Sequence, residues 1–168
     1  MNKWTFPTQI YAGPDSLNRL TAFSNESILI ICDPFLKDSP SLTYVMGLMD
    51  SKNKVTIYTD VVPDPPITHV VKGIEFMEGI KPTVIIAIGG GSCIDMSKGI
   101  AYFSRKLKHM DIKSFIAVPT TSGTGSEVTS FAVLTDSETQ IKYPLMDDAV
   151  SPDEALLTPL FVKTSPPN

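Results

Sequence analysis

The chain has 168 residues and a net charge of −4, with 42% hydrophobic and 19% charged residues. This length allows one domain with a sizeable core, and the balance of residues is that of a globular protein. No basic run points to a nucleic-acid partner, no apolar stretch reaches the ~18 residues of a membrane span, and the N-terminus lacks the apolar core of a signal peptide, so we expect a cytoplasmic protein.

Strands alternate with amphipathic helices along the first half of the predicted structure. The expected strands cover residues 6–11 (an edge strand), 27–33 and 54–60. A short helix is expected after Ser16, and a longer one over residues 67–79. Between them, Ser39 and Pro40 predict a helix start, followed by an apolar face made of Leu42, Val45, Met46 and Met49.

The stretch from Thr83 to Lys98 contains the strongest local signal. It begins with an uncharged apolar run that is typical of a strand buried on both faces, and glycines 89–91 follow at once. We expect Ser92 to cap the next helix, with Asp95 at the third helical position. A strand, a glycine turn and a helix start in this order direct backbone N–H groups toward an anion, and glycine lets a phosphate come close.

The same stretch has a second interpretation, as a tight connection between a strand and a helix. It lacks the last glycine of the G-x-G-x-x-G fingerprint and the Gly-Lys-Ser/Thr of a Walker A loop. The prediction of phosphate binding therefore depends on support from the rest of the chain.

A second glycine-rich loop follows the next predicted strand. That strand covers residues 114–118, and the loop, residues 119–127, is rich in hydroxyl groups. Residues 128–135 and 140–143 predict a β-hairpin. The α/β domain is expected to span residues 1–150, and the proline-rich residues 151–168 are expected to form a tail.

This alternation predicts an α/β fold with an open, mainly parallel sheet flanked by helices. In such sheets, ligands bind beyond the carboxyl ends of the strands. Asp33, glycines 89–91 and the loop 119–127 each follow a predicted strand, so we expect them on one rim, where they would form a dinucleotide site.

Individual residues at this rim have alternative interpretations. Asp33 could bind a ribose and repel a 2′-phosphate, which favours NAD over NADP, or it could cap the loop before Pro34. Lys98 could reach a phosphate or be solvated, and Lys142 could reach the cofactor or lie exposed. The hydroxyl groups of the loop 119–127 could hold the cofactor or cap their own turns.

We predict no catalytic and no metal-binding residue in this chain. Cys32 and Cys93 are expected to be small buried thiols in a reducing compartment, and His69 and His109 lack the spacing of metal ligands. A nicotinamide enzyme needs a metal or a proton donor to polarise its carbonyl or alkoxide, and that part of a site is missing here.

Two motifs together resemble the iron-containing (group III) alcohol dehydrogenases: Gly89-Gly-Gly-Ser-Cys-Ile-Asp-Met-Ser-Lys98 and Pro119-Thr-Thr-Ser-Gly-Thr-Gly-Ser-Glu-Val-Thr129. Their order fits the family, as do Asp33 and the segment Asp64-Pro-Pro-Ile67. The segments 9–13, 30–33 and 141–145 are similar to the branch of this family that serves propanediol utilisation. The resemblance covers most of the chain.

The resemblance implies a Rossmann-like dinucleotide-binding domain of the type shared with dehydroquinate synthase. It implies an NAD(H)-dependent oxidoreductase that interconverts a short primary alcohol and an aldehyde, with 1-propanol and propanal as the expected pair, in the cytoplasm or inside a bacterial microcompartment. We also expect a homo-oligomer. By motif position, the implied cofactor-binding residues are Asp33, Gly89, Gly90, Gly91, Ser92, Asp95, Thr120, Thr121, Thr124, Ser126 and Lys142.

The resemblance also implies a metal, iron or zinc, held by one aspartate and three histidines in a helical domain beyond the Pro-Pro of the tail. The chain stops at Asn168, directly after Pro166-Pro167, and Thr158-Pro159 stands where the family usually has Asp-Pro. We therefore expect an NAD(H)-binding half, inactive alone. The alternatives are a non-catalytic nucleotide-binding or assembly fragment and a relative of glycerol dehydrogenase.

Overall fold

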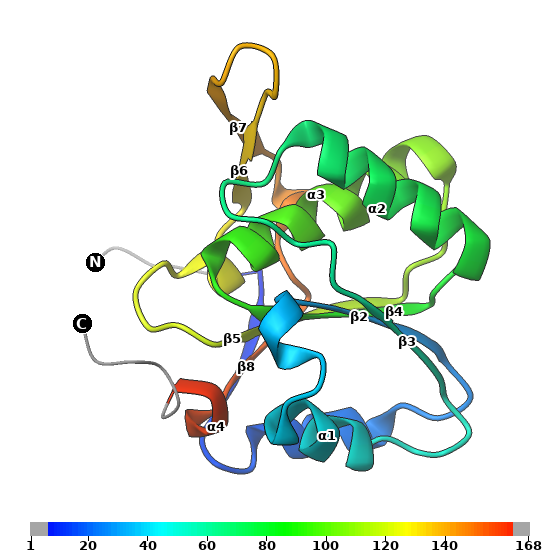
Figure 1. Ribbon diagram of the computed structural model, residues 1–168. Helices are drawn as coiled ribbons and strands as arrows, with labels where there is room; N and C mark the ends of the chain where they lie inside the picture. The colour runs from blue at the N-terminus through cyan, green and yellow to red at the C-terminus, as the bar shows by residue number, and fades with distance from the viewer. Residues whose placement is uncertain (1–6, 163–168) are drawn as a thin grey trace, which may run out of the picture.

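A computed structural model describes residues 7–162, and its main feature is a six-stranded sheet in which every pairing is parallel (Figure 1). The strand order is β1-β8-β5-β4-β2-β3. The strands are β1 (Gln9–Ala12), β2 (Ser27–Cys32), β3 (Lys54–Tyr58), β4 (Val84–Gly89), β5 (Ser114–Pro119) and β8 (Glu154–Leu157). The prediction of an open, mainly parallel α/β sheet is confirmed.

Helices cover both faces of this sheet. In Figure 1, α2 (Ile67–Ile80) and α3 (Gly91–Lys108) lie on one face, and α1 (Pro40–Gly47) and α4 (Pro159–Val162) lie on the other. Four 3₁₀ turns complete the described elements: η1 (Ser16–Ala22), η2 (Pro34–Leu36), η3 (Ser126–Val128) and η4 (Asp148–Val150). Ser39 caps α1 as predicted, because its side chain accepts a hydrogen bond from the Leu42 N–H.

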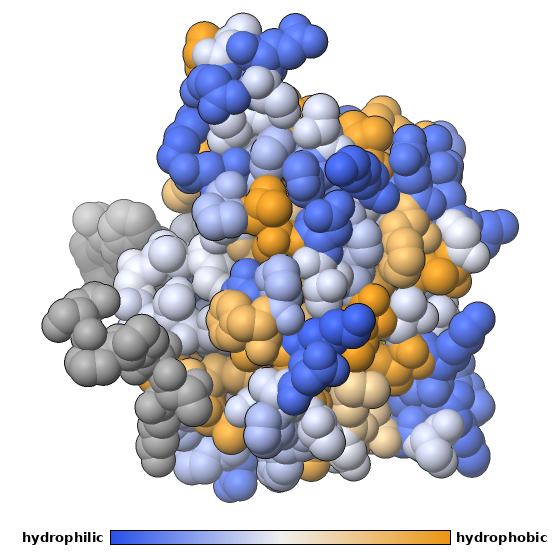
Figure 2. Space-filling view, viewed as in Figure 1, coloured by the Kyte–Doolittle hydropathy of each residue, from blue (hydrophilic) through white to orange (hydrophobic). Residues whose placement is uncertain are grey.

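The central strands are buried on both faces because their side chains alternate between two cores. Leu29 and Ile31 of β2 pack in the core under α2 and α3. Ile28 and Ile30 of the same strand pack in the opposite core, beneath η1 and α1. Figure 2 shows that the apolar residues exposed on the viewed face are scattered in small groups, which is consistent with this burial.

The predicted hairpin is confirmed and projects from the α3 side of the molecule (Figure 1). Its strands, β6 (Phe131–Thr135) and β7 (Lys142–Met146), pair antiparallel and form a separate two-stranded sheet. The base of β6 packs on α3, with Ala132 and Leu134 buried. The loop between β5 and β6 is therefore fixed at its far end by α3.

Two sequence-based expectations about packing and boundaries need correction. The segment 151–168 was expected to leave the domain after residue 150, but β8 lies inside the sheet between β1 and β5. Met46 was expected to face inward, but it is 38% exposed, because α1 is short and only Leu42 and Val45 face the sheet. The predicted first residue of the edge strand, residue 6, lies outside the described residues; β1 begins at Gln9.

Within residues 7–162, no helix has the length and apolar character of a membrane span.

Gly73 marks a close contact between α2 and α3 that tests this packing. A Cβ atom at Gly73 would lie 2.3 Å from Cδ1 and 2.8 Å from Cγ1 of Ile100, whose side chain is fully buried. We expect Gly73→Ala to lower the free energy of unfolding by about 1–3 kcal/mol. Urea denaturation measures this, with Gly79→Ala on the same helix as the control.

The control should behave in the opposite way. A Cβ atom at Gly79 meets nothing within 4 Å, so alanine there should raise the free energy of unfolding by up to about 1 kcal/mol through helix propensity. Adding Ile100→Val to Gly73→Ala removes Cδ1 and should restore part of the loss. Equal stability of the two alanine variants would contradict the tight contact between the helices.

Candidate functional site

The three polar stretches singled out in the sequence meet at one rim of the sheet. Strands β2, β4 and β5 are parallel neighbours, so their carboxyl ends lie side by side, with Cys32 opposite Ile88 and Gly89 opposite Pro119. The chain then continues into Asp33, the glycine turn and the loop 119–127. The Thr120 N–H donates to the Gly89 carbonyl over 3.0 Å, which joins the two glycine-rich segments.

The glycine turn is tightly enclosed at both ends and open in the middle. A Cβ atom at Gly89 would lie 2.5 Å from Cβ of Cys93 and 2.7 Å from the Asp33 carboxylate, and one at Gly91 would lie 2.9 Å from Cγ2 of Thr124. At Gly90 the nearest atom would be 3.5 Å away, on Thr121. The protein itself therefore requires glycine at 89 and 91, whereas Gly90 leaves surface that a ligand could use.

Helix α3 begins at Gly91, two residues earlier than a cap at Ser92 implies. Gly90 occupies the N-cap position in an extended conformation and makes no side-chain cap, so Ser92 is not the cap and Asp95 is not at the third helical position. The reason is the close joining of β4 and α3 by a single residue. The first amides of α3 have no acceptor within the helix, and they face the rim where an anion could bind.

Asp33 lies against the glycine turn, and its alternative role as a cap fails. Its Oδ2 accepts a hydrogen bond from the Gly90 N–H over 3.2 Å, and it makes no side-chain cap on η2. Burial raises the pKa of the Asp33 carboxyl, and the Gly90 N–H opposes that shift. The carboxylate is thus fixed beside the glycine turn, where ribose hydroxyl groups of a dinucleotide could reach it.

A pocket of about 260 Å³ separates the start of α3 from the hydroxyl-rich loop. Gly91, Ser92 and Asp95 form one side, and Thr124, Ser126, Thr129 and Phe131 form the other. Asp95 bridges the two sides, because its carboxylate accepts from the Ser126 hydroxyl over 2.5 Å and from the Val133 N–H over 3.0 Å. Asp95 therefore joins α3 to the loop and to β6 instead of capping the helix.

The remaining predicted residues lie around this pocket at different depths. Thr121 lies beside Gly90 and faces a neighbouring pocket of about 510 Å³ at the ends of β5 and β8. Thr120 is 6% exposed and is held by its bond to Gly89. A pocket of about 570 Å³ lies at the opposite rim, next to Lys81 and Lys108, and no predicted site residue lines it.

Lys142 reaches the edge of the site through a partner that residue-level reasoning did not single out. Its ammonium group pairs with Asp64 over 2.6 Å, and the Asp64 N–H lies 3.3 Å from the Ser92 hydroxyl, to which it donates. The hairpin is thereby tied to the start of α3. The segment Asp64-Pro-Pro-Ile67 was noticed in the sequence as part of the family resemblance. Nothing in its pattern indicated that Asp64 would pair with Lys142 and contact Ser92.

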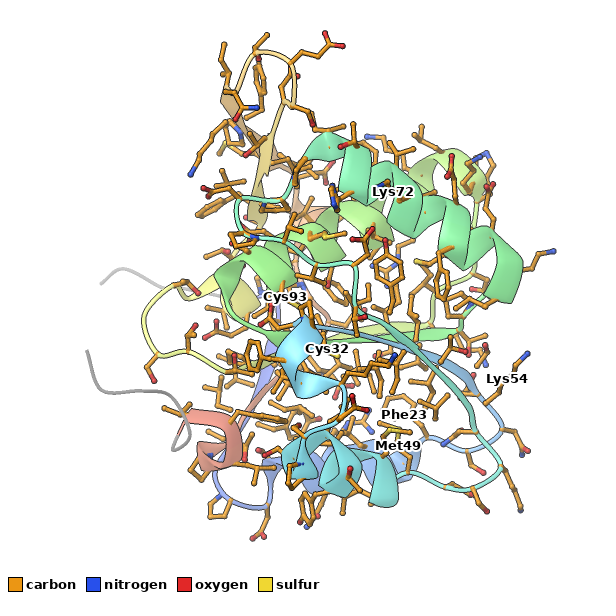
Figure 3. The ribbon with its side chains drawn as sticks, in the orientation of Figure 1. Phe23, Cys32, Met49, Lys54, Lys72 and Cys93 are labelled. Carbon is orange, nitrogen blue, oxygen red and sulfur yellow. The ribbon has the colours of Figure 1, made fainter. Side chains whose placement is uncertain are left out.

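Two further predictions concern Lys98 and the cysteines. Both alternatives for Lys98 are wrong: it reaches no solvent and faces backbone carbonyls of the loop. Cys32 and Cys93 are free, buried thiols as expected (Figure 3), and burial raises the pKa of Cys32 to about 11. Within residues 7–162, no three His, Cys, Asp or Glu side chains lie together as a metal site needs.

Comparison with known proteins places this site in a family context. Residues 7–159 match the model of the iron-containing alcohol dehydrogenases. The chain is 43% identical over 167 residues to the 1-propanol dehydrogenase PduQ of Citrobacter freundii, covering 99% of this chain and 45% of that protein. It is 37% identical to the NADPH-dependent butanol dehydrogenase of Clostridium saccharobutylicum, covering 99% of this chain and 47% of that protein.

A solved structure agrees with the sequence comparison. The sulfoacetaldehyde reductase of Bifidobacterium kashiwanohense, in complex with NAD+, superposes with a TM-score of 0.87 at 25% identity, covering 99% of this chain and 48% of that one. The chain thus spans about half the length of each of these three proteins.

Proposed function

Because the chain belongs to the iron-containing alcohol dehydrogenase family, we propose that it is the NAD(H)-binding half of an enzyme that interconverts a short primary alcohol and its aldehyde. The observation that carries this proposal is the meeting of Asp33, the open glycine turn and the hydroxyl-rich loop at one rim. Similarity to a structure solved with NAD+ supports the same cofactor.

Each part of the rim has a proposed role in holding the cofactor. Asp33 accepts hydrogen bonds from the adenosine ribose. Gly89 to Ser92 seat the pyrophosphate, because the free amides and positive end of α3 favour an anion. Thr124 and Ser126 line the adjoining pocket, Thr121 faces the neighbouring pocket, and Thr120 is buried beside Gly89. Asp95 and Lys142 fix the segments around the pocket.

The proposed substrate pair is 1-propanol and propanal, on the basis of the relative at 43% identity. In the reduction, a hydride passes from the nicotinamide to the carbonyl carbon and a proton passes to the oxygen. The residues described here do not fit the metal that the family name implies, so we assign no step through a metal to them. We assign no catalytic residue to this chain, and we expect it to bind NAD(H) without turnover.

The partners and location follow the same proposal. We expect a homo-oligomer that works in the cytoplasm, with a bacterial microcompartment as the location if the propanediol branch applies. A second candidate is a nucleotide-binding or assembly module without catalysis, which is favoured by the lack of a metal-binding cluster within the described part of the chain.

A fluorescence titration with NADH tests the proposed function. We expect NADH to bind weakly, with an enhanced or shifted emission that saturates, and propanal reduction to be absent when Fe²⁺ or Zn²⁺ is added. Saturable binding without turnover supports the NAD(H)-binding half. Metal-dependent turnover would refute its inactivity, and a lack of any NADH binding would favour the assembly module.

A further inference from the structure

Lys98 is a buried lysine, and within the described part of the chain its ammonium group donates hydrogen bonds only to residues 129 and 131. It lies in the middle of α3 with no exposed surface. Its Nζ donates to the Thr129 carbonyl over 2.8 Å, to the Thr129 hydroxyl over 3.0 Å and to the Phe131 carbonyl over 2.8 Å. A buried ammonium group is costly unless it is fully hydrogen-bonded, so this arrangement requires an explanation.

The two residues that accept hydrogen bonds from Lys98 also line the pocket beside the glycine turn. Thr129 and Phe131 both line that pocket, opposite Gly91. One turn earlier on α3, Asp95 holds Ser126 and Val133. Two opposite charges on one helix therefore hold a single segment, residues 126–133, and they set its distance from the start of the same helix.

We propose that Lys98 is a positioning residue for the dinucleotide, which holds residues 129–131 against α3 and so keeps the pocket lined by Gly91, Thr129 and Phe131 at the width that the cofactor needs. This inference rests on the proposed function, because it assumes that a dinucleotide occupies the rim. Lys98 acts through the loop and β6, and its ammonium group is fully occupied by protein oxygens.

The charge state of Lys98 gives this role a pH dependence. Three acceptors need the three N–H donors of the ammonium form, whereas a neutral amine has two. Burial lowers the pKa of Lys98 to about 8, while Asp95 on its own helix and Glu127 in η3 act to raise it, and β6 contributes the Phe131 ring, 6.0 Å away. Above about pH 8 one bond is lost, the segment loosens, and affinity for the dinucleotide should fall.

Stability should change in the opposite direction over the same pH range. The pKa of Lys98 in the folded chain lies below its ordinary value of 10.5, so between about pH 8 and 10.5 the unfolded chain binds more protons. The free energy of unfolding therefore rises with pH in that window. A loss of affinity together with a gain in stability distinguishes a positioning role from general loosening of the fold.

NADH titrations at pH 7 and pH 9.5 test the proposal on the unmodified chain and on Lys98→Met. The unmodified chain should bind about tenfold more weakly at pH 9.5. Lys98→Met should bind about tenfold more weakly already at pH 7, with no further loss at pH 9.5. Lys72→Met, which changes a lysine on α2 with a 59% exposed side chain (Figure 3), should follow the unmodified chain.

The outcomes separate this inference from the proposed function. If the unmodified chain binds NADH equally at both pH values, or if folded Lys98→Met keeps both its affinity and the pH profile, the positioning role is wrong. If Lys98→Met does not fold, the pH profile of the unmodified chain still decides. If NADH does not bind at all, the proposed function fails and the role of Lys98 toward a dinucleotide fails with it. Amide hydrogen exchange then tests the hold of Lys98 on the segment: faster exchange at residues 129–133 above pH 8, relative to α2, supports that hold, and unchanged relative exchange refutes it.

Discussion

Replacing Gly90 with valine is expected to lower the affinity for NADH about a hundredfold or more and to leave the fold in place. The protein leaves space at this position, since a Cβ atom would have its nearest contact at 3.5 Å, and Gly90 has an extended backbone (φ −76°, ψ −175°) that valine adopts easily. The added side chain would instead fill the surface that the pyrophosphate needs. The loss of about two charge-assisted hydrogen bonds corresponds to about 3 kcal/mol or more.

The matched controls for Gly90→Val are Gly91→Ala and Gly79→Val. Alanine at Gly91 would collide with Thr124, so it should lower both affinity and the melting temperature. Valine at Gly79, whose Cβ position is open, should change neither binding nor the fold appreciably. Gly90→Val should cost about 1 kcal/mol of stability at most, as the loss of a favourable N-cap residue. If it keeps the affinity of the unmodified chain, the pyrophosphate binds elsewhere.

The arrangement of the rim was predictable because its signals are local. Gly89 to Gly91 follow a run of apolar residues that is typical of a buried strand, and the parallel sheet then brings Asp33 and the loop 119–127 to the same edge. Neither step needs knowledge of distant contacts. Topological rules for parallel sheets place strand ends together once the strands are recognised.

The contacts of Asp95 and Lys98 were beyond the sequence because both depend on a segment about 30 residues away. Asp95 binds Ser126 and Val133, and Lys98 binds Thr129 and Phe131. From local patterns alone, a charged residue in the first turns of a helix is expected to contact a bound anion or to be solvated. Here the packing of η3 and β6 on α3 buries Lys98 fully and Asp95 partly, and the two charges hold groups of residues 126–133.

Strand β8 was missed for a related reason. Residues 154–157 are short and have prolines on both sides, at Pro152 and Pro159, so their local pattern favours a loop. The sheet nevertheless offers a vacant edge on β5, and β8 pairs there as well as with β1. Residues 154–157 form a strand because they pair with β1 and β5. No pattern within these four residues indicates that pairing.

We propose that Asp33 determines the choice between NADH and NADPH, and Asp33→Asn should then change that choice by about a hundredfold. Asparagine keeps an oxygen that can accept from the Gly90 N–H but removes the charge. NADH should bind about tenfold more weakly, because a charge-assisted bond to the ribose is lost. NADPH should bind about tenfold more tightly, because a carboxylate about 4 Å from a 2′-phosphate is repelled by up to about 4 kcal/mol.

The measurement is the ratio of the two dissociation constants, with Asp111→Asn on the opposite rim as the control that should leave it unchanged. Burial raises the pKa of Asp33, so lowering the pH toward that value should neutralise the carboxyl and shift the ratio in the same direction as Asp33→Asn. Because asparagine cannot titrate, this shift should be absent from the variant. A relative that depends on NADPH shows that cofactor choice varies among similar chains, so an unchanged ratio in Asp33→Asn would remove Asp33 from the ribose and place the adenosine elsewhere on the rim.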